Sequence, residues 1–103
     1  MNDRELLELA AKADGVARSQ WDYEWVRGRN PLKDDGDALR LAVTLGIRIL
    51  HVNQESYMGY PNTVVAGTFE FGMVEEMYED HNDCFAAVRR AIVRAAALIG
   101  EGE

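Results

Sequence analysis

The spacing of the apolar residues changes along this chain from helical to strand-like and back, and the order of these changes limits the folds it can adopt. The predicted helices cover residues 3–14, 34–45 and a last segment from 82 or 83 to about 99. The clearest predicted strands cover 19–26, 47–52 and 64–71. The order α-β-α-β-β-α lacks the regular alternation that a parallel doubly wound sheet requires. We therefore expect an α+β fold in which an antiparallel sheet of three to five strands packs with three helices.

The first helix carries start and stop signals. Asn2 is placed to cap it, with Glu5 at the capping-box position, and Gly15 follows as the stop. Its predicted buried face comprises four residues at helical spacing: Leu6, Leu9, Ala10 and Ala13.

The second helix begins in an acidic cluster formed by Asp34, Asp35 and Asp37. Carboxylates in a first turn complement the positive end of the helix dipole, which favours a structural role. Together with Arg89 and Arg90, the cluster could instead bind a metal or a polar ligand, although it lacks the spacing of an EF-hand calcium loop. We expect no metal here.

The apolar surface of the second helix is unusually broad. One stripe is formed by Ala38, Leu41, Ala42 and Leu45, and Leu39 and Val43 extend it round the far side. Because an apolar helix needs cover on more than one face, we expect this helix to be covered on several sides and the protein to form a homo-oligomer.

The third helix has a predicted buried stripe of Phe85, Val88, Ile92, Ala96 and Ile99. Arg89 falls at the edge of this stripe, and Arg90 and Arg94 are predicted to face solvent. The arginines also interrupt the longest alanine-rich segment, so no stretch approaches the roughly 20 apolar residues needed to cross a bilayer.

The first predicted strand, 19–26, places Trp21, Tyr23 and Trp25 on one face. Aromatic side chains at this period are typical of a core, but they also stack on bases. Arg27 and Arg29 follow in the next loop and, with Arg89, complete a candidate site for a nucleotide-like ligand.

The later strand signals are less uniform. Residues 64–71 form the clearest later strand, with Val65, Phe69 and Phe71 expected on one face. Residues 57–60 form a short apolar segment, and residues 73–78 either extend the sheet or return as a hairpin, which periodicity does not decide.

Length and charge define the broad class. A chain of 103 residues fits one domain, 1–103, and its net charge of −7 disfavours direct binding to nucleic acid. The one cysteine, Cys84, excludes an intramolecular disulfide, and the N-terminus lacks an apolar signal core. We therefore expect a cytoplasmic protein with no membrane contact.

Two runs of residues resemble a known family. The run from Asn30 to Val43 (NPLKDDGDALRLAV) and the run from Asp83 to Ala96 (DCFAAVRRAIVRAA) resemble the phage ABA sandwich domain family of tailed phages and prophages. Both are more distantly similar to NinX-type proteins of lambdoid phages. The family tends to have proline where this chain has Cys84. The resemblance implies a sheet covered by helices and a phage origin, and it carries no activity.

Two further clusters invite functional readings. An acidic run ahead of the last helix either mimics a phosphate backbone towards a host protein or is a solvated face: Glu75, Glu76, Glu79, Asp80 and Asp83. Cys84 lies near His81, but the pair lacks the ligand spacing of a zinc site and any motif of nucleophilic catalysis.

The function that these features favour is binding. We expect a non-enzymatic phage accessory protein, without a cofactor, that binds a host component in host takeover or counter-defence against a bacterial immune system. The alternative is a protein that sequesters a small nucleotide signal through the aromatic and arginine residues. Binding to a host protein would use the acidic run instead.

Overall fold

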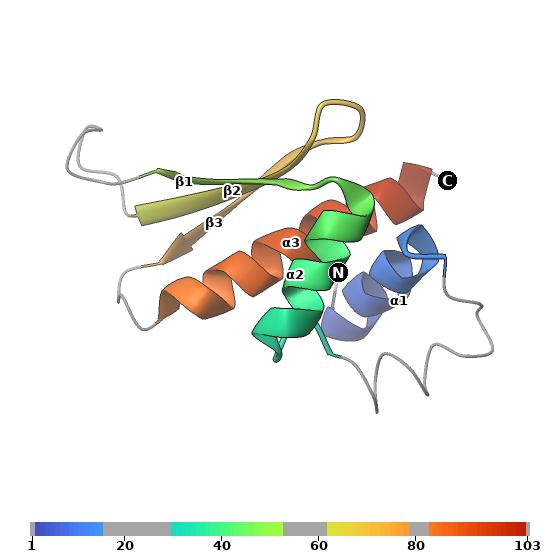
Figure 1. Cartoon of the computed structure of the whole chain (residues 1–103), viewed down its shortest axis with the longest axis horizontal. Coiled ribbons are helices and arrows are strands. Elements are labelled where there is room, and N and C mark those ends of the chain that lie inside the picture. Colours follow the sequence, from blue (N-terminus) through green and yellow to red (C-terminus); the bar gives the residue numbers. More distant parts are fainter. Residues whose placement is uncertain (1, 16–29, 53–61, 79–82, 103) are drawn as a thin grey trace.

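The described part of the chain is an α+β structure in which helices cover one side of an antiparallel sheet (Figure 1). The computed structural model describes residues 2–15, 30–52, 62–78 and 83–102. Their elements follow the order α1 (Asp3–Ala13), α2 (Asp35–Leu45), β1 (Arg48–Val52), β2 (Asn62–Thr68), β3 (Gly72–Tyr78) and α3 (Cys84–Gly102). The predicted α+β class is confirmed. The predicted strand 19–26 and segment 57–60 lie outside the described residues.

Local capping explains where the first two helices begin and end. The Asn2 side chain accepts a hydrogen bond from the Glu5 backbone N–H at 2.8 Å, and Asp34 does the same for Asp37 at 2.8 Å. Helix α2 ends at Gly46, whose φ of 67° is left-handed, so that the Ile47 N–H reaches the Ala42 carbonyl. The predicted limits of α1 and α2 are confirmed to within one residue.

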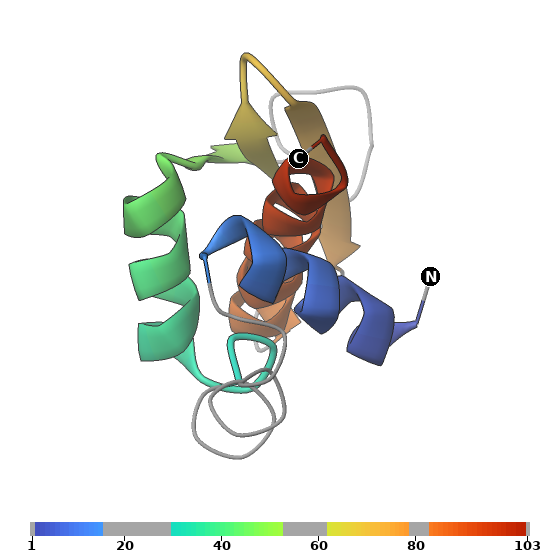
Figure 2. The ribbon, with the colours of Figure 1, turned by 90° about the vertical axis from the view of Figure 1, so that its right-hand side faces the viewer.

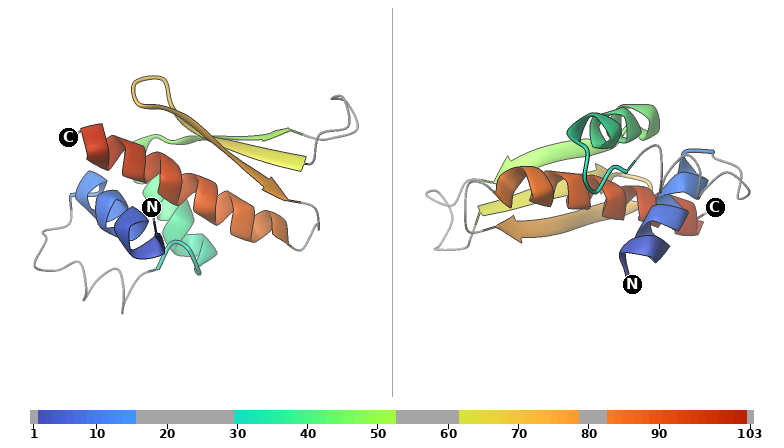
Figure 3. Two further views of the ribbon diagram at one scale, coloured as in Figure 1. Left: turned by 180° about the vertical axis from the view of Figure 1, so that it is seen from behind. Right: turned by 90° about the horizontal axis from the view of Figure 1, so that it is seen from below.

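The sheet has the order β1-β2-β3, with both pairs antiparallel. Strands β2 and β3 form a hairpin closed around residues 69–71, which decides the open question about residues 73–78 in favour of a hairpin return. Helix α3 packs along β2 and β3, and α1 and α2 pack against α3 (Figures 2 and 3).

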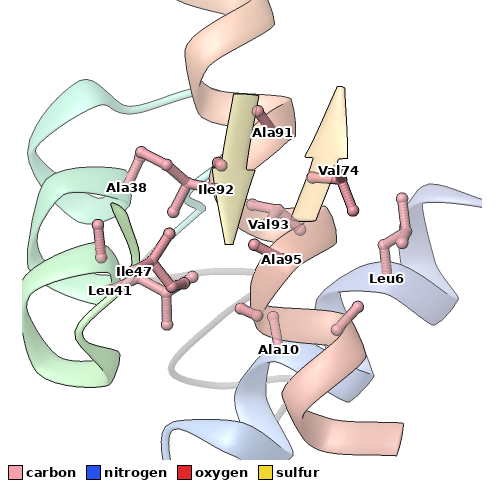
Figure 4. Close-up of a cluster of buried hydrophobic side chains, with 14 of the residues drawn as sticks. Leu6, Ala10, Ala38, Leu41, Ile47, Val74, Ala91, Ile92, Val93 and Ala95 are labelled. Carbon is pink, nitrogen blue, oxygen red and sulfur yellow. The ribbon is translucent and has the colours of Figure 1, made fainter. Parts of the chain in front are cut away.

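The core lies between α3 and its neighbours and consists of small and aliphatic side chains (Figure 4). Its fully buried members include Ala10, Val64, Ala66, Ala91 and Val93. Alanines in α3 let the helices approach closely, and a Cβ on Gly100 would collide with the Leu9 carbonyl of α1. The α1–α3 contact therefore depends on a glycine.

The structure corrects the predicted buried faces of α1 and β2. In α1 the face includes Leu7 and Ala11, while Leu9 and Ala13 are only partly buried. In β2 the buried residues are Val64 and Ala66 rather than Val65. Phe69, in the hairpin turn, is 88% exposed and Phe71 is partly buried. Because 64–66 is apolar at every position, alternation could not select the inward face.

In α3 the predicted stripe holds at Ile92, Ala96 and Ile99, but Phe85 is 64% exposed. The cover expected on several sides of α2 is also wrong for the single chain, since Leu39 is 59% and Val43 is 73% exposed. Within the described ranges, no helix is long and apolar enough to cross a membrane.

Candidate functional site

A groove runs between the first half of α2, strand β1 and the first turns of α3, and it encloses a cavity of about 310 Å³. Its lining is largely aliphatic and aromatic: Ala38, Leu39, Ile49, Phe85, Val88 and Ile92. Asp35, His51, Cys84 and Arg89 add the polar atoms. We call this the α2–α3 groove. Its volume is at the lower end of the range for small-ligand pockets, roughly 300–1,000 Å³.

Two large side chains of the groove are left in water. Leu39 and Phe85 are 59% and 64% exposed although both line the cavity. Leu39 extends from α2 and Phe85 from the first turn of α3, so the two elements present apolar side chains to the same opening. An apolar side chain of a partner can therefore be buried between them.

The predicted helix-start cluster is held by local and tertiary bonds. Asp34 caps the helix, and Asp37 accepts a hydrogen bond from the Asn30 N–H at 2.9 Å. Asp35 accepts from Arg89 Nη1 at 2.6 Å. These contacts use the three carboxylates to fix the 30–37 segment and attach it to α3.

Arg89 lies on the groove wall, and two of its nitrogens, Nε and Nη1, are engaged by groups of the fold. Its Nε–H donates to the Leu32 carbonyl at 2.9 Å, its Nη1 pairs with Asp35, and its side chain is only 20% exposed. The other residues of the predicted ligand site, Trp21, Tyr23, Trp25, Arg27 and Arg29, lie outside the described residues.

The predicted acidic run is divided between the two faces of β3. Glu75 is exposed, whereas the Glu76 side chain is only 19% exposed and its Oε1 accepts from Arg94 at 2.9 Å. Arg90 Nε lies 3.5 Å from the same oxygen. Glu79 and Asp80 lie outside the described residues, as does His81.

The prediction that Arg90 and Arg94 face solvent holds only in part, because their side chains are 41% and 37% exposed and also pair with other elements. Arg94 Nη1 also donates to the Glu75 carbonyl at 2.7 Å, and Arg90 Nη1 donates to Asp3 at 2.9 Å. The two arginines therefore connect α3 with β3 and α1, and Glu76 is a partner within the fold rather than part of an acidic surface.

Cys84 is the free thiol of the groove and is partly buried. A side-chain hydrogen bond with Cys84 raises the pKa of Tyr78, at the end of β3, above its ordinary value of 10.0. This contact joins the last residue of β3 to the first residue of α3. Among the side chains described, no group of three or more His, Cys, Asp or Glu residues is arranged to hold a metal.

Comparisons with protein-family models, with curated proteins and with solved structures find no match to this chain.

Proposed function

We propose that this chain is a non-enzymatic phage accessory protein that binds a host protein in the host cytoplasm, in host takeover or counter-defence. The phage origin rests on the resemblance of residues 30–43 and 83–96, which carries no activity. The role in host takeover or counter-defence follows from that origin together with the small size, the net charge of −7 and the absence of catalytic motifs in the sequence. The observation that carries binding is the α2–α3 groove, where Leu39 and Phe85 are exposed around a cavity of about 310 Å³.

The groove fits a partner that offers an apolar side chain from a basic segment. Asp34 and Asp83 are exposed near the helix starts, whereas Asp35, which lines the groove, is paired with Arg89. The chain as a whole carries a net charge of −7, which accelerates encounter with a basic surface. Burying one leucine or phenylalanine side chain contributes about 1.5–3 kcal/mol, and the charges add orientation.

Charge-introducing variants test this proposal. Tagged protein expressed in bacteria is expected to retain a specific host protein, and Leu39→Glu or Phe85→Glu is expected to lose it. Val43→Glu is the matched control, because Val43 is 73% exposed on α2 and does not line the groove. Urea unfolding must show that all three variants fold. A partner that survives both groove variants but is lost from Val43→Glu would contradict the groove assignment.

The single thiol offers a second measurement in the same place. Because Cys84 lines the groove and is the chain's one cysteine, a thiol-reactive fluorophore labels this site alone. A partner seated in the groove is expected to slow labelling of Cys84 and to be blocked by the label once attached. Unchanged labelling in the complex would place the partner elsewhere.

A second candidate function is the sequestration of a small nucleotide-like molecule, favoured by the presence of Arg89 in the wall of a ligand-sized cavity. Native mass spectrometry of gently purified protein tests it. A co-purifying small molecule that is lost in Phe85→Glu would support this function in the groove, and a ligand retained by that variant would place it outside.

A further inference from the structure

We infer that the face of the sheet turned away from the helices is the interface of a reversible homodimer. We call this surface the open sheet face and define it by Arg48, Leu50, Val65, Met73, Glu75 and Met77. The inference is independent of the α2–α3 groove and of its partner.

The strand register places these residues together. Leu50 pairs with Val65, and Val65 pairs with Glu75, which forms one row across the three strands. Arg48 and Met73 flank this row through their shared partner Gly67. Because side chains alternate along a strand, these residues share the face opposite the buried Val64 and Ala66.

The helices leave this face uncovered. Helices α1, α2 and α3 all lie on one side of the sheet (Figures 1 and 3). Leu50, Met73 and Met77 are 58%, 46% and 62% exposed. An antiparallel sheet with one face in water normally alternates polar residues onto that face, whereas here the apolar residues continue across all three strands. The face has the composition of an interface, including two methionines that adapt to a partner's shape.

The charges on the face indicate what covers it. Arg48 and Glu75 have opposite signs, so the face is neutral, although the chain carries −7. Arg48 is held at the hairpin end by the Phe69 ring, whose centroid lies 4.4 Å from the guanidinium carbon. A neutral face with one charge of each sign, on opposite edge strands, is complementary to itself and has no preference for a basic partner.

A two-fold axis parallel to the strands and above Val65 brings the two apolar faces together and brings opposite charges of the two copies near each other. It places β1 of one copy over β3 of the other, so that Arg48 lies one residue pair, roughly 7 Å along the strand, from Glu75 of the second copy. Both side chains are long enough to meet across that distance. Val65 lies opposite its own copy at the centre, Leu50 lies opposite Glu75 of the second copy, and Arg48 lies opposite Met73 of the second copy.

The size of the face sets the expected strength. Three strands about 4.8 Å apart, with five to seven residues rising about 3.3 Å each, present roughly 300 Å² in projection. This area is well below the roughly 800 Å² that each partner buries in a standard-size specific interface. The expected dimer is therefore weak and transient.

Sedimentation velocity or light scattering over roughly 1–300 micromolar protein tests this interface. The unmodified chain is expected to pass from monomer to dimer in this range. Leu50→Glu and Met77→Glu are expected to raise the dissociation constant at least about tenfold. The first places a second carboxylate opposite Glu75 of the other copy, and the second buries a charge in the interface. Leu39→Glu, in the groove, is the matched control and is expected to leave it unchanged. Circular dichroism and urea unfolding confirm that each variant folds.

A charge exchange identifies the predicted arrangement. Arg48→Glu and Glu75→Arg, each alone, are expected to weaken the dimer several-fold, and the double variant is expected to recover most of the loss. A chain that stays monomeric to the highest concentration overturns the inference. So does a dimer that tolerates Leu50→Glu and Met77→Glu, or one that is lost with Leu39→Glu instead.

Discussion

Replacement of Arg89 by methionine separates a structural role from a ligand-binding one. Methionine retains most of the apolar stem that Arg89 buries and removes its hydrogen-bond donors. Two contacts are lost, the bond from Nε to the Leu32 carbonyl at 2.9 Å and the pair with Asp35 at 2.6 Å. Both contacts attach the segment before α2 to α3.

The two contacts are expected to contribute different amounts to the free energy of unfolding. A hydrogen bond from a charged donor to a half-buried carbonyl contributes about 1.5–3 kcal/mol. The Asp35 side chain is 65% exposed, so solvent screening limits that ion pair to about 0–1 kcal/mol. We therefore expect Arg89→Met to lower the free energy of unfolding by about 2 kcal/mol, which corresponds to roughly 10 °C in Tm for a chain of this length.

Urea unfolding followed by circular dichroism measures this loss. Asp35→Asn is expected to cost less than about 1 kcal/mol, and the double variant is expected to show a coupling energy of similar size. A loss below about 0.5 kcal/mol for Arg89→Met, with an unchanged m-value, would refute the reasoning. In that case the guanidinium would not be holding the fold and would be free to bind a ligand in the groove.

Three further substitutions test other contacts of the fold. Gly100→Ala gains about 1 kcal/mol of helix propensity but pushes Leu9 away, so we expect a net loss of about 1–3 kcal/mol in urea unfolding. Glu76→Ala leaves two arginines of α3 without their shared acceptor and is expected to cost about 1–2 kcal/mol, with Glu76→Gln costing less. The raised pKa of Tyr78 means that the folded state favours its neutral form, so this stabilisation is present below about pH 10 and is lost as pH rises through the raised pKa. Tyr78→Phe is therefore expected to make the urea midpoint fall less steeply above about pH 10, and an identical fall in both proteins would contradict the contact with Cys84.

Helix limits were predictable because their signals are local. Asn2, Asp34 and Gly46 act on backbone groups within one turn, and the structure shows each in that role. The fold class followed from the order of periodicities, and the structure confirms the α+β class, although 19–26 lies outside the described residues. Local sequence signals are therefore sufficient to predict most of the helices and the fold class.

Buried faces and ion pairs were harder to predict because they depend on distant residues. Arg94 appears solvent-facing on its own helix, and its partner Glu76 lies 18 positions earlier, on β3. Phe85 fits the apolar period of α3, but burial in that helix begins at Ala87. The groove is not predictable from the sequence because its walls come from α2, β1 and α3, which lie far apart along the chain. Its one sequence signal is the breadth of the apolar surface of α2 at Leu39, which also fits an oligomer contact.

Dimerisation through the open sheet face would make the groove bivalent. The groove is lined by α2, α3 and the inward side of β1, so two copies joined by their sheets carry their grooves on outer sides. Tethering both sites raises the apparent affinity for a partner presented at high density, by about 10²–10⁴ when the spacing fits. Met77→Glu is therefore expected to bind a free partner as the unmodified chain does but to dissociate faster from a densely coated sensor surface. Phe85→Glu is expected to lose binding to the free partner and to the densely coated surface. Equal dissociation of Met77→Glu and the unmodified chain from the dense surface, with the dimer shown to be disrupted, would mean that the two grooves cannot be engaged together.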